Sequence, residues 1–175
     1  MALKRGIVEL EEFNNNWFEE YEKEKKFLEN KLKEKAIEIH HVGSTSITGL
    51  KAKPVIDILV AIEHLNKINE IEEILNDYGY SNRGHQGVED RYFFAKGPEE
   101  ARTHYIHFVE KNSNTYYNLV YFKRYLIEHP KYIQKYCEIK QDLASKYPEE
   151  RSKYTAGKNE FITNVIKLAK EEYND

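Results

Sequence analysis

Apolar positions along this 175-residue chain change their spacing, and each change marks a different kind of element. In residues 9–35 they recur at helical spacing, with Glu and Lys on the other faces, which predicts an amphipathic helix. Residues 36–42 predict a strand. Residues 55–62 are apolar on both alternating faces, which is typical of a central strand covered on both sides.

The middle of the chain predicts one more helix and a pair of strands. Apolar residues in 65–78 have helical spacing, and Gly79 is placed to end that helix. Residues 91–96 and 102–109 predict two strands. Their connection, 97–101, contains Gly and Pro and has the length of a hairpin loop, so we expect the two strands to pair antiparallel.

The last third of the chain is helical in pattern. We expect one helix over 115–127, a second begun by Pro130, and a third that ends near Tyr173, with Pro148 separating the last two. Strands grouped between helices predict an α+β fold with a small mixed sheet and flanking N- and C-terminal helices. Residues 1–175 contain no repeat and no linker-like stretch, which predicts a single domain.

Composition limits the partners. The formal charge of −3 gives no global attraction to nucleic acid, so a phosphate ligand would have to be held locally, and nucleic acid is not an expected partner. No apolar stretch approaches the ~20 residues of a membrane span. The charged N-terminus lacks the apolar run of a signal peptide, and the single cysteine, Cys137, excludes an internal disulfide. We therefore expect a cytoplasmic protein. Its oligomeric state is not indicated.

The segment with the clearest chemistry is Gly43-Ser44-Thr45, which follows one predicted strand and precedes another. A Gly-Ser turn that opens a helix offers free backbone N–H groups and a positive dipole end, which favour a phosphate. The alternative is an ordinary helix N-cap, since Ser and Thr cap many helices. The spacing fits neither a Walker loop nor the Gly-x-Gly-x-x-Gly dinucleotide motif.

Asp57 interrupts the apolar strand 55–62. A carboxylate there is costly to desolvate unless a cation or several donors compensate it. One interpretation is a structural ion pair with Lys53 or Arg102. The other is a ligand for Mg²⁺, or an acid that contacts a ribose or base.

Arg102, His104 and His107 lie on one predicted strand, where neighbours alternate faces. Arg102 and His104 therefore share a face, and His107 points the other way, which argues against a zinc site formed by both histidines. We predict that Arg102 and His104 face the phosphate site, the alternative being a hydrogen-bonded structural histidine. Lys53 and Lys96, at strand ends, are the predicted phosphate-neutralising lysines.

The stretch from His41 to Asp57 resembles the opening motif of the GrpB-like proteins, a family assigned to the nucleotidyltransferase superfamily. The similarity covers most of the chain beyond the N-terminal helix, through segments at 91–97, 102–107, 122–130 and 154–162. The resemblance implies a nucleotidyltransferase-like fold, in which a Gly-Ser turn precedes an Asp-x-Asp pair on the next strand.

This chain departs from that pattern at the pair. Asp57 can take the place of either aspartate, but its companion would then be Val55 or Leu59. Other departures are Ser46-Ile47-Thr48 in place of Ala-Val-Pro, Tyr105 where a third histidine is common, and Arg124 where an aspartate is usual. None of these changes affects Gly43, Ser44, Thr45 or Asp57.

The resemblance and the residues together allow three functions. The first is transfer of a nucleotidyl or related phosphoryl group from a nucleoside triphosphate to a small acceptor, and the expected partner is a nucleoside triphosphate or another phosphorylated small molecule. The turn would then hold phosphates, Asp57 would bind Mg²⁺, and Arg102 or Lys96 would offset charge; Glu89, Asp90 or His104 would replace the missing carboxylate. The second is a non-catalytic module for a nucleotide or a coenzyme A-related ligand, since similar domains occur fused to dephospho-coenzyme A kinase. The third is a structural or oligomerising domain.

Overall fold

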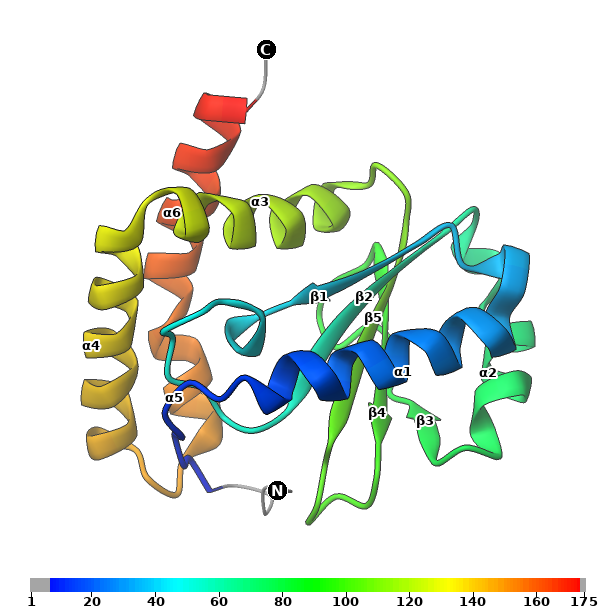
Figure 1. Ribbon diagram of the computed structural model, residues 1–175, viewed down its shortest axis with the longest axis horizontal. Helices are drawn as coiled ribbons and strands as arrows, with labels where there is room; N and C mark the ends of the chain where they lie inside the picture. The colour runs from blue at the N-terminus through cyan, green and yellow to red at the C-terminus, as the bar shows by residue number, and fades with distance from the viewer. Residues whose placement is uncertain (1–6, 174–175) are drawn as a thin grey trace.

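A five-stranded mixed sheet forms the centre of the computed structural model, which describes residues 7–173 (Figure 1). The strand order is β1-β2-β5-β4-β3. β2 and β5 pair in parallel, and the other neighbours pair antiparallel. The strands are β1 (Glu38–Val42), β2 (Ile56–Ile62), β3 (Tyr80–Asn82), β4 (Arg91–Lys96) and β5 (His104–Glu110).

One face of the sheet is covered by α1 (Asn16–Leu32) and α2 (Ile68–Asn76). Their apolar stripes pack against Ile58 and Phe108, which are fully buried. The helix predicted for 9–35 begins only at Asn16, because the backbone of Glu11 pairs with Ala52 through bonds of 2.9 and 3.1 Å. Short 3₁₀ turns follow or precede the main elements, at Lys33–Lys35, Ser44–Ser46 and Leu65–Lys67.

The C-terminal helices form a second apolar cluster at the end of the molecule opposite α2 and β3 (Figure 1). Ile47 and Leu50, just after the Gly-Ser turn, are fully buried in this cluster, so helical packing fixes the segment that leaves the turn. The helices are α3 (Asn114–Glu128), α4 (Pro130–Lys146), α5 (Arg151–Gly157) and α6 (Asn159–Tyr173). α3 also covers part of the second sheet face.

The predicted α+β fold, with a small mixed sheet and flanking helices, is confirmed. The β4–β5 pair is antiparallel as expected. The helix predicted for 65–78 is a 3₁₀ turn followed by α2, which ends at Asn76, so Gly79, with a φ of +80°, lies beyond the end of the helix. Two predictions were incomplete. The three-residue strand β3 was missed, and the third C-terminal helix is divided at Lys158 into α5 and α6. Within residues 7–173, no helix is long and apolar enough to cross a membrane.

Candidate functional site

The Gly-Ser turn and Asp57 lie directly against each other. Gly43 follows β1 with a φ of +68°, and a Cβ at this position would lie 2.8 Å from Oδ2 of Asp57. Glycine is therefore required both by the backbone conformation and by the close approach of the carboxylate. In the described part of the chain, the amides of Ser44 and Thr45 have no hydrogen-bond acceptor. The predicted proximity is confirmed, while phosphate binding stays a prediction.

The side chains of His41 and Ser46 stabilise the turn through hydrogen bonds. Nε2 of His41 lies 2.9 Å from Oγ1 of Thr45, and its ring stacks on Tyr21 with centroids 4.6 Å apart. Burial, aided by the charge of Lys123, lowers the pKa of His41 to about 4, so it is neutral at pH 7. Ser46 donates to the Gly43 carbonyl at 2.6 Å. The Thr45 and Ser46 hydroxyls are thus engaged internally.

Asp57 is the first member of a hydrogen-bonded series of side chains that crosses the sheet. Its Oδ1 lies 3.3 Å from Nε2 of His107 on β5, and Nδ1 of His107 lies 3.4 Å from Arg91 on β4. Because the guanidinium can only donate, Nδ1 accepts and the ring proton lies on Nε2, directed at the carboxylate. Arg91 is itself fixed by the carbonyls of His85 and Gln86 at 3.1 and 3.3 Å.

On the other side of the turn, α4 contributes a buried lysine. Lys140 is 1% exposed, and its Nζ donates to Oγ of Ser44 at 3.1 Å and to the carbonyl of Lys51. Its ammonium also lies 4.7 Å from the centre of the Tyr136 ring. Burial lowers the pKa of Lys140 to about 7, with the nearby charge of Lys158 adding to the effect.

Two further lysines share the ring of Tyr154. Lys53 lies 5.6 Å and Lys158 4.6 Å from its centroid, and Tyr154 is itself buried. Burial lowers the pKa of Lys53 to about 7 and that of Lys158 to about 8. The charge of Arg151 acts in the same direction on both, whereas Asp57 opposes it.

The three lysines, Lys53, Lys140 and Lys158, are called the lysine cluster. Among residues 7–173, no carboxylate lies within ion-pair distance of any of them. Asp57 is near enough to influence Lys53 and Lys158, but its nearest partner is His107. Desolvated cations without a paired anion are costly, and an anionic ligand would remove that cost.

The Gly-Ser turn has one carboxylate beside it, that of Asp57, that could bind a metal. Asp57 is 29% exposed, and within the described residues no group of three or more His, Cys, Asp or Glu side chains could hold a metal ion. Asp90 accepts from the amide and hydroxyl of Thr115 at 2.9 and 2.5 Å, and Glu89 is exposed. The site fits Mg²⁺ only where ligand phosphates and water supply the other oxygens, as in many nucleotide sites.

The structure places His104 and Lys96 on the opposite face of the sheet. Lys96 binds both carboxylate oxygens of Glu24 of α1 at 2.8 Å, and Nε2 of His104 lies 3.8 Å from that carboxylate. The prediction that Arg102 and His104 share a cleft was therefore wrong. Strand alternation starts only at His104, where β5 begins, so it does not govern Arg102.

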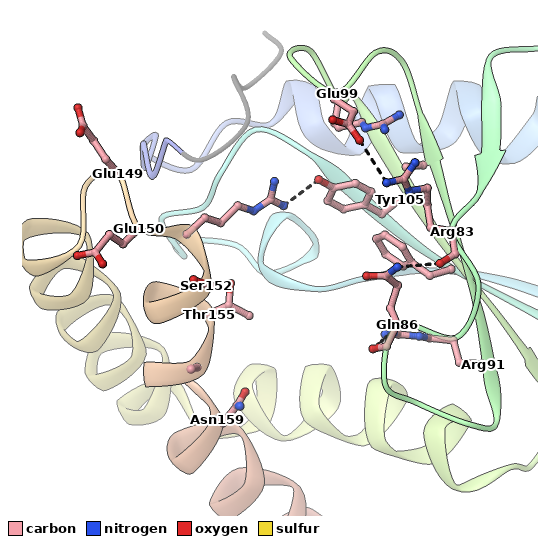
Figure 2. Close-up of a pocket in the computed structure, with 15 residues that line it drawn as sticks. Arg83, Gln86, Arg91, Glu99, Tyr105, Glu149, Glu150, Ser152, Thr155 and Asn159 are labelled. Atoms are coloured by element: carbon pink, nitrogen blue, oxygen red, sulfur yellow. Dashed lines mark hydrogen bonds and ion pairs between the residues drawn. The ribbon is translucent and has the colours of Figure 1, made fainter.

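Arg102 lies in a cleft of about 1080 Å³ between β4–β5 and α5 (Figure 2). Its guanidinium donates to the carbonyl of Gly97. Figure 2 shows Tyr105 and Arg91 on the strand side, facing Ser152 and Thr155 of α5. Of the predicted residues, the structure brings together Gly43, Ser44, Thr45, Asp57 and Lys53, with Arg102 in the neighbouring cleft.

Sequence reasoning missed His107 and Lys140 as site residues. The alternation had placed His107 opposite His104, but it did not say which face holds Asp57. Lys140 had a detectable signal: it occupies a position on the apolar stripe of its helix, together with Ile133, Tyr136 and Ala144. A lysine at such a position must be desolvated or bound.

Fold and site together define a small mixed α/β protein with a lysine-rich polar site at a Gly-Ser turn. The family model described as GrpB protein matches residues 7–168. The chain therefore belongs to the GrpB family.

Similar proteins agree with this assignment. The UPF0157 protein YqkA of Bacillus subtilis is 33% identical over 93% of this chain, which spans 47% of YqkA. The crystal structure of GrpB from Enterococcus faecalis matches with a TM-score of 0.88 at 33% identity, over 95% of this chain and all of that one. A weaker likeness, with a TM-score of 0.46 at 16% identity over 74% of this chain and 45% of that one, is to the poly(U) polymerase Cid1; it carries no functional argument.

Proposed function

We propose that this protein binds the phosphate groups of a nucleotide, or of another phosphorylated small molecule, at the turn Gly43-Ser44-Thr45. The observation that carries the proposal is the lysine cluster. The buried Lys140 donates to Ser44 of the turn, and the half-buried Lys53 and Lys158 are near enough to Asp57 to be influenced by its charge. The described residues offer none of the three a paired carboxylate. A phosphate is the ligand whose charge and oxygens match such a set.

The backbone supports the same ligand. The amides of Ser44 and Thr45 have no acceptor in the described chain, and Lys140 fixes Ser44 through its hydroxyl. A phosphate oxygen would accept from these amides while the lysines neutralise its charge. The hydroxyl of Thr45 already pairs with His41, so Thr45 would contribute its backbone rather than its side chain.

Asp57 is the proposed ligand for Mg²⁺. Its position against Gly43 puts a carboxylate next to the turn, and His107 orients one of its oxygens. Mg²⁺ is often held by one or two carboxylates together with substrate phosphates, so one acid is sufficient for binding. When bound, Mg²⁺ would neutralise phosphate charge; the protein's own residues would position the ligand.

Transfer of a nucleotidyl group to a small acceptor is the proposed activity. The geometry offers positioning and charge for this reaction, which need few residues. One observation favours the alternative, a non-catalytic module for a nucleotide or a coenzyme A-related ligand. Val55 and Leu59 flank Asp57, and Asp90 is occupied by Thr115, so no second carboxylate completes a two-metal site in the described chain.

The test is calorimetric titration of magnesium ADP and magnesium pyrophosphate into the wild type, Asp57→Asn and Lys53→Gln. Lys51→Gln is the matched control, since Lys51 lies two positions from Lys53 but pairs with Glu12 at 2.6 Å. We expect Lys53→Gln and Asp57→Asn each to weaken binding about tenfold or more, and Lys51→Gln to change it less than about twofold.

Removing Mg²⁺ should weaken wild-type binding but not that of Asp57→Asn. If Asp57 were instead a purely structural acid, Asp57→Asn would leave ligand binding unchanged and lower the melting temperature. That result, or equal effects of Lys53→Gln and Lys51→Gln, would reject the proposed site. Turnover is checked separately, by release of pyrophosphate from a nucleoside triphosphate in the presence of candidate acceptors.

A further inference from the structure

We propose that the cleft between β4–β5 and α5 is a second anion-binding site, which takes a small molecule bearing a carboxylate or a phosphate. The cleft measures about 1080 Å³, enough for a metabolite beside a nucleotide. Four arginines, Arg83, Arg91, Arg102 and Arg151, line it together with three glutamates, Glu99, Glu149 and Glu150.

The carboxylates of the cleft do not balance these arginines. Glu99 pairs with Arg83 at 3.2 Å, and Glu150 pairs with Lys153 at 2.5 Å. Figure 2 shows the Glu149 and Glu150 side chains directed away from Tyr105 and the arginine side of the cleft. In the described part of the chain, Arg91, Arg102 and Arg151 have no carboxylate within ion-pair distance.

The bonds of these arginines leave donors free. Arg102 is held by the Gly97 carbonyl, and Arg151 donates to the Tyr105 hydroxyl at 2.8 Å, both neutral acceptors. Nε of Arg91 is buried and has no acceptor among residues 7–173. A guanidinium has five N–H donors, and its fork matches the two oxygens of a carboxylate or phosphate.

The cleft adjoins the lysine cluster. Arg151 lines the cleft and also influences the charge of Lys53 and Lys158. Tyr105, which binds Arg151, lies beside Asp57 in the parallel register of β2 and β5, where neighbouring strands are about 4.8 Å apart. An anion in the cleft would thus lie next to the proposed phosphate site. Its assignment as the acceptor of a transfer rests on the proposed function, whereas binding in the cleft does not.

The experiment uses citrate and inorganic phosphate as probes, titrated into the full chain with and without saturating magnesium pyrophosphate. The variants are Arg102→Gln and, as a control with the same charge change, Arg124→Gln; Arg124 is exposed on α3 and pairs with Glu128 at 2.9 Å. We expect Arg102→Gln to weaken the binding of citrate or of inorganic phosphate about tenfold. Arg124→Gln should weaken the binding of the same probe less than about twofold. Citrate and phosphate arms distinguish the two ligand classes.

Thermal unfolding of both variants checks that the fold is retained, and Arg151→Gln is the second test should Arg102→Gln unfold. The proposal is overturned if neither probe binds the wild type, or if the cleft variant and Arg124→Gln weaken binding equally. Lys53→Gln separates the two sites: loss of pyrophosphate binding with citrate binding retained supports two sites. If Lys53→Gln instead loses the binding of both pyrophosphate and citrate, the second site is overturned and one shared site remains.

Discussion

The two faces of the sheet both carry lysine, histidine and carboxylate side chains, but they balance charge differently. On the α1 face, Glu24 is 7% exposed and accepts from Lys96 and from the hydroxyl of Tyr80, all at 2.8 Å. On the other face, Asp57 pairs with His107. Beside it lies the lysine cluster, in which Lys53 and Lys158 are influenced by the charge of Asp57, and Lys140 contacts Ser44 of the turn.

The difference separates a structural ionic group from a candidate binding site. The Glu24 group is complete: each charge has a partner of opposite sign, and it fastens α1 to β3 and β4. The lysine cluster is incomplete, and its lowered pKa values reflect burial that no paired anion offsets. If the lysine cluster served stability alone, we would expect its positive charges to be paired with carboxylates. The excess of positive charge therefore indicates an anionic ligand.

The largest expected effect comes from a substitution that breaks the Glu24–Lys96 ion pair. Glu24→Gln leaves the ammonium of Lys96 without its anion, and we expect a loss of about 3–5 kcal/mol in the free energy of unfolding. Binding of magnesium ADP by the folded fraction should not change. Urea unfolding and calorimetry measure the two quantities. If Glu24→Gln has the wild-type free energy of unfolding but no longer binds magnesium ADP, the separation of the two faces is contradicted.

The next effect tests the contact between the turn and Asp57. Gly43→Ala places a methyl 2.8 Å from Oδ2 of Asp57 and forces alanine to a φ of +68°. We expect a loss of about 2–3 kcal/mol in unfolding free energy, together with weaker magnesium ADP binding. Gly49→Ala is the control, because it shares a positive φ, +83°, but its added Cβ meets nothing within 4 Å. Equal loss of binding in both variants would show that backbone strain, not displacement of Asp57, is responsible.

Lys53→Met should shift stability in the opposite direction. The variant removes a desolvated charge with a pKa near 7 and keeps the apolar stem against Tyr154. We expect a gain of about 1–2 kcal/mol in unfolding free energy after allowing for partial exposure, with ADP binding weakened about tenfold. Denaturant unfolding and calorimetry test this together. Loss of stability would mean that Lys53 has a structural partner.

The smallest effect is on pH dependence. The pKa values of Lys53 and Lys140, lowered by burial to about 7, lie below 10.5, their ordinary value. The unfolded chain therefore binds more protons between about pH 7 and 10, so stability should rise with pH in that range. ADP binding should fall, because the lysines lose their charge. In Lys53→Met the stability slope should be smaller, by a fraction of about 1.4 kcal/mol per pH unit because Lys53 is only partly buried. Identical slopes in unfolding measured at pH 7, 8 and 9 would contradict this.

Local patterns were sufficient for much of the fold. Helical spacing and strand alternation predicted β1, β2, β4, β5 and most helices, because each of these elements buries a continuous apolar stripe. β3 was missed because three residues are too few to show a period. The N-terminal helix was predicted too long because the apolar spacing continues through Leu10 and Phe13, whereas the backbone there pairs with Ala52.

The sequence by itself determined the turn at Gly43 and the acid at Asp57, and the family resemblance of the stretch from His41 to Asp57 predicted that the two lie together. The reason they meet is that Asp57 is paired with Val42, the residue before Gly43, in the antiparallel register of β1 and β2. The sequence also determined that His104 and His107 point to opposite faces. Only the tertiary structure decided which face carries the site: His107 reaches Asp57, whereas His104 lies near Glu24.

The tertiary structure alone also assembled the lysine cluster. Lys140 and Lys158 lie on or beside helices far along the chain from Ser44. Lys140 reaches Ser44 because Ile47 and Leu50, just after the turn, are buried among those helices. Long-range packing of this kind depends on how whole apolar faces fit together, which no local spacing records. The periodicity of a chain fixes the direction of a side chain relative to its own element, and the packing of elements fixes what that side chain meets.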